Sequence, residues 1–298
     1  MVSLRERLGY VACSSIAVTI VVAATAGCTN PPVTALERMS EANRLTADLL
    51  VQFTRAGDAA NRAVMADTDD TSVAFAREAE QATQAVQKDI DALGPILTGL
   101  QFSNESHVLE EFGRRFAEYR TLDGSILELA VENTNLKAQR LSFGPAQAEA
   151  DSFRDSLKAV RPAAAENTAR VEALAATAVA DVREIQVLQA PHIAESDDSA
   201  MARLENRMAA AEAAARGALA MLRSLAGPAS RPQLVAATAA LDRFMGLNAQ
   251  IMALSRRNTN VRSLALSLGQ KRMLIATCEE SLRALQDALA KRGFSATR

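Results

Sequence analysis

Apolar residues recur along the chain at alternating steps of three and four, the spacing of one face of an α-helix. Beyond Val33 a first stripe, which ends at the polar turn 67–72, comprises Met39, Ala42, Thr46, Leu49, Phe53, Ala56, Ala60 and Ala63. A second stripe covers 75–93, and a third covers 108–129 after a polar segment at 99–106. No stretch shows sustained alternation of β-branched residues, so the pattern predicts helices and no sheet.

One segment of the sequence occurs twice. Residues 126–135, ILELAVENTN, return as IMALSRRNTN at 251–260, an offset of 125 residues. The match continues without a gap in Leu141, Ser142, Gly144, Ser156, Leu157 and Ala159 against Leu266, Ser267, Gly269, Ser281, Leu282 and Ala284. A duplicated unit of this size indicates a repeat architecture. We therefore predict an all-α fold of two tandem antiparallel four-helix bundles, at 35–162 and 163–292, with a tail at 293–298.

The repeated tripeptide Asn133-Thr134-Asn135 is predicted to be the turn between the third and fourth helices, with Asn135 as the cap of the fourth. All four helices then have about 28 residues, or about 42 Å at 1.5 Å per residue. This division leaves Gly144-Pro145 inside the fourth helix as a kink. The alternative places the turn at Gly144-Pro145, where a glycine ends one helix and a proline begins the next.

The joint between the two predicted units contains Pro162. One heptad register continues through it from Phe153 to Leu188, which is consistent with a single long, bent helix joining the bundles. A break at Pro162 is the other arrangement, because proline removes a hydrogen bond from a helix interior. The helices of the second unit are predicted near 165–190, 199–225, 232–256 and 260–292.

Residues 1–27 have the pattern of an export signal or membrane anchor. Two arginines precede an apolar stretch at 8–26 that ends in small residues. The sequence Thr-Ala-Gly-Cys at 25–28 resembles the bacterial lipobox, in which the cysteine is lipidated and becomes the mature N-terminus. Cleavage without lipidation is one alternative, and an uncleaved helix is another, because about 20 residues span a bilayer. We predict a periplasmic or cell-envelope protein, lipidated at Cys28 and tethered by residues 28–34.

Composition supports closely packed helices and excludes several classes of function. The chain is 49% hydrophobic and only 4% aromatic, with no Trp. Its formal net charge is −2, and its basic residues form no stripe that could neutralise phosphates, so nucleic acid is not an expected partner. Cys13 lies in the apolar N-terminal stretch and Cys28 at the lipobox, which leaves Cys278 unpaired; it is interpreted as a small buried hydrophobe.

The sequence carries no recognisable catalytic motif. The two histidines, His107 and His192, lie near predicted helix ends, where solvated or dipole-related roles are expected. Neither belongs to a Glu-x-x-His pair, and haem attachment, nucleophile and phosphate-loop motifs are missing. The acidic turn 67–70 lacks the ligand spacing of a calcium loop and is interpreted as helix capping. We predict no enzyme, no cofactor and no metal site.

Three arginines on the third helix are the only candidates for ligand recognition. Arg114, Arg115 and Arg120 could hold a carboxylate between helices, although a solvated face is the simpler interpretation. The sequence therefore names no ligand-binding residue.

The region of the repeat resembles the four-helix-bundle sensory module of bacterial methyl-accepting chemotaxis receptors and related kinases. The likeness is carried by the spacing of Phe116, Tyr119, Ile126 and Leu129, followed by Lys137-Ala138, Leu141, Gly144, Phe153 and Leu157. Through the repeat it covers most of residues 33–292, and a tandem pair is also similar to the helical bimodular variety of that sensor family.

The resemblance implies a membrane-tethered sensory module that binds a ligand or a protein outside the cytoplasm. Receptors of that family continue into a cytoplasmic signalling rod, to which nothing in this sequence corresponds. The chain is therefore expected to act with a membrane receptor or envelope protein, or as a homodimer. The alternative function is a structural helical rod or assembly lipoprotein of the envelope.

Overall fold

The computed structural model of the chain describes residues 34–296, with side chains as far as residue 292. Within these residues there is no β-strand, only a single β-bridge between Pro162 and Ala226, so the predicted all-α fold is confirmed. No helix of the described part is long and apolar enough to span a bilayer. The predicted signal segment and Cys28 lie outside the described residues.

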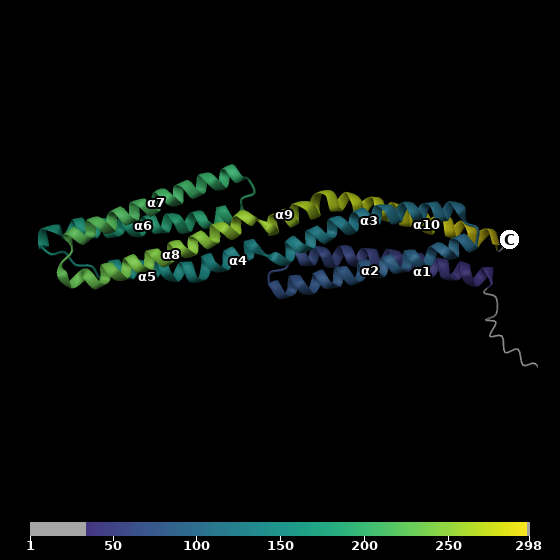
Figure 1. Cartoon of the computed structure of the whole chain (residues 1–298), viewed down its shortest axis with the longest axis horizontal. Helices are drawn as coiled ribbons and strands as arrows, with labels where there is room; N and C mark the ends of the chain where they lie inside the picture. Colours follow the sequence, from purple (N-terminus) through teal and green to yellow (C-terminus); the bar gives the residue numbers. More distant parts are fainter. Residues whose placement is uncertain (1–33, 297–298) are drawn as a thin grey trace, which may run out of the picture. The chain divides into compact units, whose positions relative to one another are not determined.

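The first bundle consists of α1 (Ala35–Val64), α2 (Asp69–Gly99), α3 (Ser103–Glu132) and α10 (Arg272–Ala296) (Figure 1). Its core contains four aromatic rings with centroids 5.0 to 6.2 Å apart, those of Phe53, Phe112, Phe116 and Tyr119. Cys278 and Leu282 of α10 lie in the same core. Aromatic pairs at these separations stabilise a core beyond the area that they bury.

The second bundle consists of α4 (Thr134–Leu141), α5 (Gln147–Lys158), α6 (Thr168–Ala194), α7 (Asp198–Leu225) and α8 (Arg231–Arg257), with α9 (Thr259–Leu266) leading from α8 back to α10 (Figure 1). Phe153 and Phe244 are its largest fully buried side chains. The buried residues of α7 and α8 include five alanines, Ala211, Ala215, Ala218, Ala237 and Ala240.

The fourth helix of each repeat packs in the bundle of the other repeat. The segment α4–α5 contacts α8, whereas α10 contacts α1 and α3. The predicted units 35–162 and 163–292, each closed by its own fourth helix, were therefore wrong. Both fourth helices carry the same apolar stripe because the sequence is duplicated, so either one fits either bundle, and periodicity alone cannot assign them.

The chain breaks between α5 and α6, as one of the two predicted arrangements required. Helix α5 ends at Lys158, Pro162 is extended, and α6 begins at Thr168 after a 3₁₀ turn at Ala165–Asn167. The alternative of one long helix through Pro162 was wrong. The proline lacks the N–H that a continuing helix needs, and the heptad register on either side of it survives without helical continuity.

Both fourth helices contain a π-helical turn at the same place in the repeat. The turns cover Ser142–Ala146 and Ser267–Lys271, 125 residues apart. The first one confirms the predicted irregularity at Gly144-Pro145. The second keeps the turn although Gln270 stands at the position of Pro145, so the proline is not its only cause.

Helices α3 and α4 are separated by one residue, and so are α8 and α9. These residues, Asn133 and Asn258, adopt the left-handed conformation with φ of 51° and 52°. The turn predicted at Asn133–Asn135 therefore exists, but it redirects the chain into the other bundle instead of reversing it. The position preceding the fourth helix is Asn133, so the prediction that Asn135 caps this helix was wrong.

The two tripeptides pair with each other through reciprocal hydrogen bonds. The backbone N–H of Thr134 donates to Oγ1 of Thr259 and the N–H of Thr259 to Oγ1 of Thr134, both at 3.1 Å. The N–H of Asn135 donates to Oδ1 of Asn260, and the reverse bond is also 3.1 Å long. This pairing gives the two copies a local two-fold relation at the point where the bundles meet.

The asparagine amides connect this pairing to the end of α6. Nδ2 of Asn135 donates to Oδ1 of Asn258 at 2.9 Å and to the carbonyl oxygen of Ile193 at 2.6 Å. Nδ2 of Asn258 donates to the carbonyl oxygen of Glu195 at 2.6 Å. The side chains thereby satisfy carbonyl groups that the end of α6 leaves without partners in the helix. We call residues 133–135 and 258–260 the junction.

The first two helices of the copies correspond at a slightly different offset. The N-caps of α2 and α7, Thr68 and Asp197, are 129 residues apart, and so are the buried Leu93 and Leu222. From α3 onward the offset is 125 residues. These two offsets give each position in one bundle an equivalent in the other.

Substitutions of Asn258 separate the contributions that its backbone conformation and its side chain make to the stability of the protein. Asn258→Gly keeps a residue that adopts positive φ but loses two hydrogen bonds, so we expect a loss of about 1–3 kcal/mol in the free energy of unfolding. Asn258→Ala loses the same bonds and adds the strain of a left-handed alanine, about 1 kcal/mol more. Urea unfolding followed by circular dichroism measures both. An alanine variant as stable as the glycine variant would contradict this account.

Candidate ligand groove and polar clusters

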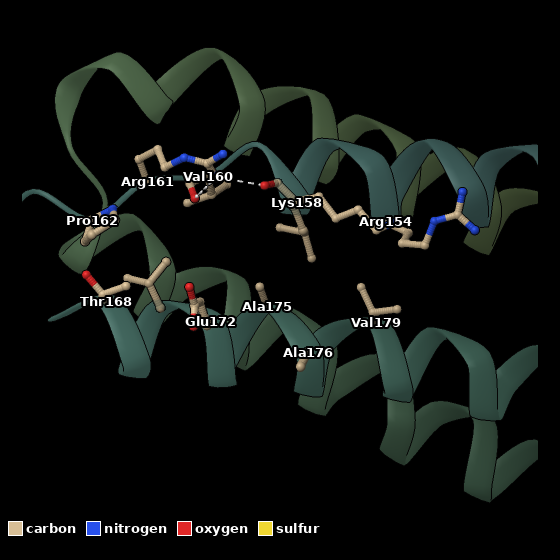
Figure 2. A pocket seen from close by; sticks show the side chains of 12 residues that line it. Arg154, Lys158, Val160, Arg161, Pro162, Thr168, Glu172, Ala175, Ala176 and Val179 are labelled. Atoms are coloured by element: carbon tan, nitrogen blue, oxygen red, sulfur yellow. Dashed lines mark hydrogen bonds between the residues drawn. The ribbon is translucent and has the colours of Figure 1, made fainter.

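A groove of about 470 Å³ lies between α5 and the first half of α6 (Figure 2). Its floor and walls are mostly apolar and comprise Leu157, Val160, Pro162, Val171, Ala175, Ala176 and Val179. Charged side chains stand around it: Arg154, Lys158, Arg161 and Glu172. A concave, mainly apolar site with a few polar groups and this volume is the usual form of a small-molecule site.

At the equivalent place in the first bundle, the fourth helix is longer and two positions carry larger side chains. Where α5 ends at Lys158, α10 continues past the equivalent Arg283 and buries Leu285 and Leu289. Across from it, α1 carries Met39 and Leu50, both packed on the core. The second bundle differs at this place in its shorter fourth helix and in smaller side chains at two positions of α6.

Smaller residues on α6 occupy the positions of those two large ones. Thr168 corresponds to Met39, and Val179 corresponds to Leu50. Both Thr168 and Val179 line the groove. The duplication therefore provides an internal comparison between an open groove and a closed one.

Hydrogen bonds to the α7–α8 loop fix the segment that closes one end of the groove. The N–H of Ala163 donates to the carbonyl of Leu225 at 2.9 Å, and the N–H of Gly227 to the carbonyl of Arg161 at 3.0 Å. Ser230, which is buried, accepts a bond from the N–H of Arg161 at 2.8 Å. The wall formed by Pro162 is thus part of the folded bundle.

The cations at the groove differ in how strongly they are held. Arg154 bonds Asp151 at 2.7 Å and Asp155 at 2.9 Å. Arg161 donates through Nη1 to the carbonyls of Lys158 and Val160, which caps the end of α5. Lys158 makes one ion pair, of 3.6 Å, with Asp155, and its side chain is 68% exposed. The Lys158 ammonium is the least constrained of the three.

A second groove, of about 440 Å³, lies between α2 and α3. Arg77 and Arg120 line it together with Asp123, and Arg120 is one of the three predicted candidates. Ala76 and Val131 line this groove, and their equivalents in the second bundle are Glu205 and Arg256. These two residues form an ion pair at the corresponding place.

Beneath this second groove lies a buried ion pair that sequence reasoning missed. Nζ of Lys271 is 2.6 Å from Oδ1 of Asp123, and both side chains are almost fully buried. Lys271 also stands over the ring of Tyr119 at 5.7 Å. Burial raises the pKa of Asp123, and the Lys271 charge opposes that shift. Burial also raises the pKa of Tyr119.

The π-helical turn explains why this pair escaped prediction. Lys271 is the last residue of that turn, and its position in an ordinary helical register does not identify it as a core residue. At the equivalent positions the other bundle has Ala146 and Asn248, and there Asn248 accepts a 2.9 Å bond from Gln189. This polar layer is thus ionic in the first bundle and uncharged at the equivalent positions of the second.

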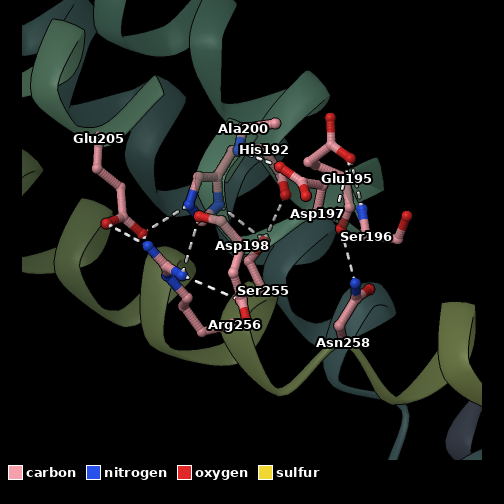
Figure 3. A network of polar contacts seen from close by, with 10 residues as sticks. All are labelled: His192, Glu195, Ser196, Asp197, Asp198, Ala200, Glu205, Ser255, Arg256 and Asn258. Atoms are coloured by element: carbon pink, nitrogen blue, oxygen red, sulfur yellow. Dashed lines mark hydrogen bonds and ion pairs between the residues drawn. The ribbon is translucent and has the colours of Figure 1, made fainter. Parts of the chain in front are cut away.

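His192, at the end of α6, is fully buried in a polar network (Figure 3). Its Nδ1 lies 2.8 Å from Oγ of Ser255, and its Nε2 lies 2.8 Å from Oε1 of Glu205. Arg256 donates to both oxygens of Glu205 at 2.8 Å and pairs with Asp198 at 3.1 Å. His192 does lie at a helix end as predicted, but the expectation of a solvated side chain was wrong.

The order Ser255, His192, Glu205 resembles that of a hydrolase triad, but the geometry does not support nucleophilic catalysis. Ser255 is fully buried, and its hydroxyl donates to the backbone carbonyl of His192 at 2.8 Å. No substrate carbonyl can reach this oxygen. The network instead connects α6, α7 and α8 next to the junction.

The other sequence candidates are placed as follows. Cys278 is buried as predicted, and burial raises the pKa of its thiol to about 12. Arg115 pairs with Glu111 at 2.5 Å on the same helix. At the acidic turn, helix α2 is capped by Thr68, whose Oγ1 accepts from the N–H of Thr71, with Asp69 and Asp70 in its first turn.

His107 and Arg114 of α3 take part in neither groove. Among the described residues, no group of three or more acidic, histidine or cysteine side chains is placed to hold a metal ion. Comparison of the chain with protein-family models, curated proteins and solved structures found no match.

The His192 network predicts a specific acid sensitivity. Hydrogen bonds from Arg256, and secondarily from His192, lower the pKa of Glu205 to about 2. A lowered folded-state pKa means stability that is present above the unfolded value of 4.5 and is lost as the pH falls toward 2. We expect Glu205→Gln to cost about 1.5–3 kcal/mol above pH 5 and progressively less below pH 4.

Urea midpoints measured from pH 2 to pH 7 test this expectation. Glu212→Gln, on the same helix but in a surface pair with Arg216, is the matched control and should change the midpoint little at any pH. A stability difference between wild type and Glu205→Gln that stays constant down to pH 2 would argue against the assigned role of Glu205.

Proposed function

We propose that this chain is an extracytoplasmic, membrane-tethered sensory module that binds a small molecule or a protein and that acts on a separate protein for transduction. The observation that carries the proposal is the groove between α5 and α6. A structural bundle gains stability by filling its helix contacts, as the equivalent place in the first bundle does. The second bundle leaves this place open and lines it with apolar and cationic groups.

The connection between the bundles supports a sensory role. Helix α5, which forms one wall of the groove, continues through α4 and the junction into α3 of the other bundle. Helix α6, the opposite wall, ends at the carbonyls that the junction asparagines bind. A ligand that changed the separation of these walls would act on both sides of the junction.

The resemblance to chemoreceptor sensory modules supports the same function by analogy. In both cases a four-helix bundle would hold a ligand between helices. The proposal includes no enzymatic activity and no cofactor, and the partner would be a membrane receptor, an envelope protein or a second copy of the chain.

A structural rod or assembly lipoprotein is the second candidate function. Its support is the packing of the rest of the chain, with many fully buried alanines and apolar core clusters in both bundles. A rod has no use for a ligand, so the two functions differ in their response to small molecules.

A thermal-shift screen with small acids and amines distinguishes the two functions. A ligand present at 100 times its dissociation constant adds about 2.7 kcal/mol to the stability of the folded state, which raises the melting temperature of a chain of this size by several degrees. A sensory module should respond to one chemical class in this way. If every class left the melting temperature unchanged, the structural function would be favoured.

Membrane tethering is tested at Cys28. We expect the wild-type chain to incorporate a radiolabelled fatty acid and to fractionate with membranes when it is expressed in bacteria, and Cys28→Ser to lose the label. Cys278→Ser is the matched control and should keep it, because Cys278 is buried in the first bundle. Equal labelling of wild type and Cys28→Ser would rule out lipidation at this residue.

A further inference from the structure

We infer that the α5–α6 groove binds a monoacyl anion, a molecule with one alkyl chain that ends in a carboxylate. The inference rests on the proposed function and specifies its ligand. Three properties of the groove carry it: its length, its volume and the distribution of charge along it.

The groove follows α6 from Thr168 to Val179. At 1.5 Å per residue this is about 16 Å, the length of an extended chain of about ten carbons with its head group. The side chains along this path include apolar residues on both sides, with Leu157 of α5 and the following Val160 on one side and Val171 and Ala175 of α6 on the other. A narrow apolar path between two helices suits an alkyl chain better than a compact polar molecule.

The volume limits the ligand to a single chain. At about 30 Å³ for each non-hydrogen atom, the share of one molecule in liquid water, 470 Å³ holds about 15 such atoms. Decanoate has about a dozen. A membrane lipid with two chains has several times as many, so the groove fits a free monoacyl molecule better than an intact bilayer lipid.

Charge identifies the part of the groove in which the head group lies. Arg161 and Pro162 lie at the end where α6 begins, Lys158 lies farther along, and Arg154, which two aspartates hold, lies toward Val179 (Figure 2). The side chain of Lys158 is 68% exposed and makes one ion pair of 3.6 Å with Asp155, so its ammonium is accessible to a carboxylate. The N-terminal end of α6 adds a partial positive charge there. The only acidic residue lining the groove, Glu172, faces the same end and opposes these cations.

The presence of Glu172 among the cations makes the inference testable by changes of opposite sign. Lys158→Gln should weaken the binding of decanoate, and Glu172→Gln should strengthen it, by about threefold to tenfold each. Neither should alter the binding of decanol, which has the same chain and no charge. Lys88→Gln, an exposed charge change on α2, is the matched control and should have no effect.

The internal repeat supplies a variant that closes the groove. Thr168→Met together with Val179→Leu introduces the residues that the first bundle has at the equivalent positions. Each methylene excluded from the groove weakens binding about fourfold, so the double variant should lose at least tenfold in affinity. Val187→Leu makes the same change as Val179→Leu at a 71% exposed site on α6 and should bind as wild type does.

The experiment uses the full chain in detergent and decanoate that carries a photoreactive diazirine near its methyl end. After irradiation, mass spectrometry locates the label, which we expect on residues 154–179, and unlabelled decanoate competes for it. The site of labelling and the competition are both measured on the protein. All variants are compared in the same detergent, so partition of the probe into micelles affects them equally. Melting curves confirm that each variant is folded, and the exposed Lys158→Gln provides the test if the groove-closing variant is not.

Label outside the groove, no label, or equal competition by decanol and decanoate would overturn the inference. These outcomes leave the proposed function standing if another ligand class raises the melting temperature of the wild type and not that of the groove-closing variant. If no class does so, the proposed function fails as well.

Discussion

The structure depends on the reciprocal pairing of the two Asn-Thr-Asn segments. In an ordinary hairpin of helices, a turn reverses the chain and the next helix packs on the preceding one. Here a single left-handed residue, Asn133 or Asn258, redirects the helix without reversing it, and the first N–H groups of the next helix need partners because they have none within that helix. The threonine and asparagine oxygens of the opposite copy supply them. Each segment thus satisfies the helix-start N–H groups of the other.

The sequence was sufficient to predict the helices, the repeat and the existence of a break at Asn133, because each depends on local pattern. It was insufficient to predict which bundle receives α4–α5 and α10, since duplication makes the two destinations chemically equivalent. The decisive contacts join residues about 125 positions apart, such as Thr134 and Thr259, and no local signal distinguishes a pairing partner from a helix cap. The burial of Cys278 followed from periodicity, whereas Lys271 was missed because a π-helical turn shifts its register.

The candidate groove was also beyond prediction, for a different reason. The groove is defined by the shorter length of α5 and the smaller side chains of α6 in comparison with α10 and α1. Such differences produce no motif in the sequence. The internal repeat predicts the groove only if it is known which helices pack against each other. Thr168 and Val179 indicate a groove when they are compared with Met39 and Leu50, the larger residues at the equivalent positions of the first bundle. The polar network shows the same asymmetry, with His192 and Ser255 where the first copy has Ala63 and Ala130.

Helix α6 contributes to the groove, to the polar network and to the junction. Its first half forms a wall of the groove, and its last turn carries His192 and the carbonyl of Ile193 that binds Asn135. Its 27 residues span about 40 Å as one helix. A packed helix transmits displacement with little compression, so a ligand that moved its first turns would alter the hydrogen bonds at its last. Those bonds hold the junction, which is where both bundles are joined. The asymmetry introduced after duplication therefore connects a groove at one end of α6 to the pairing that defines the fold at the other.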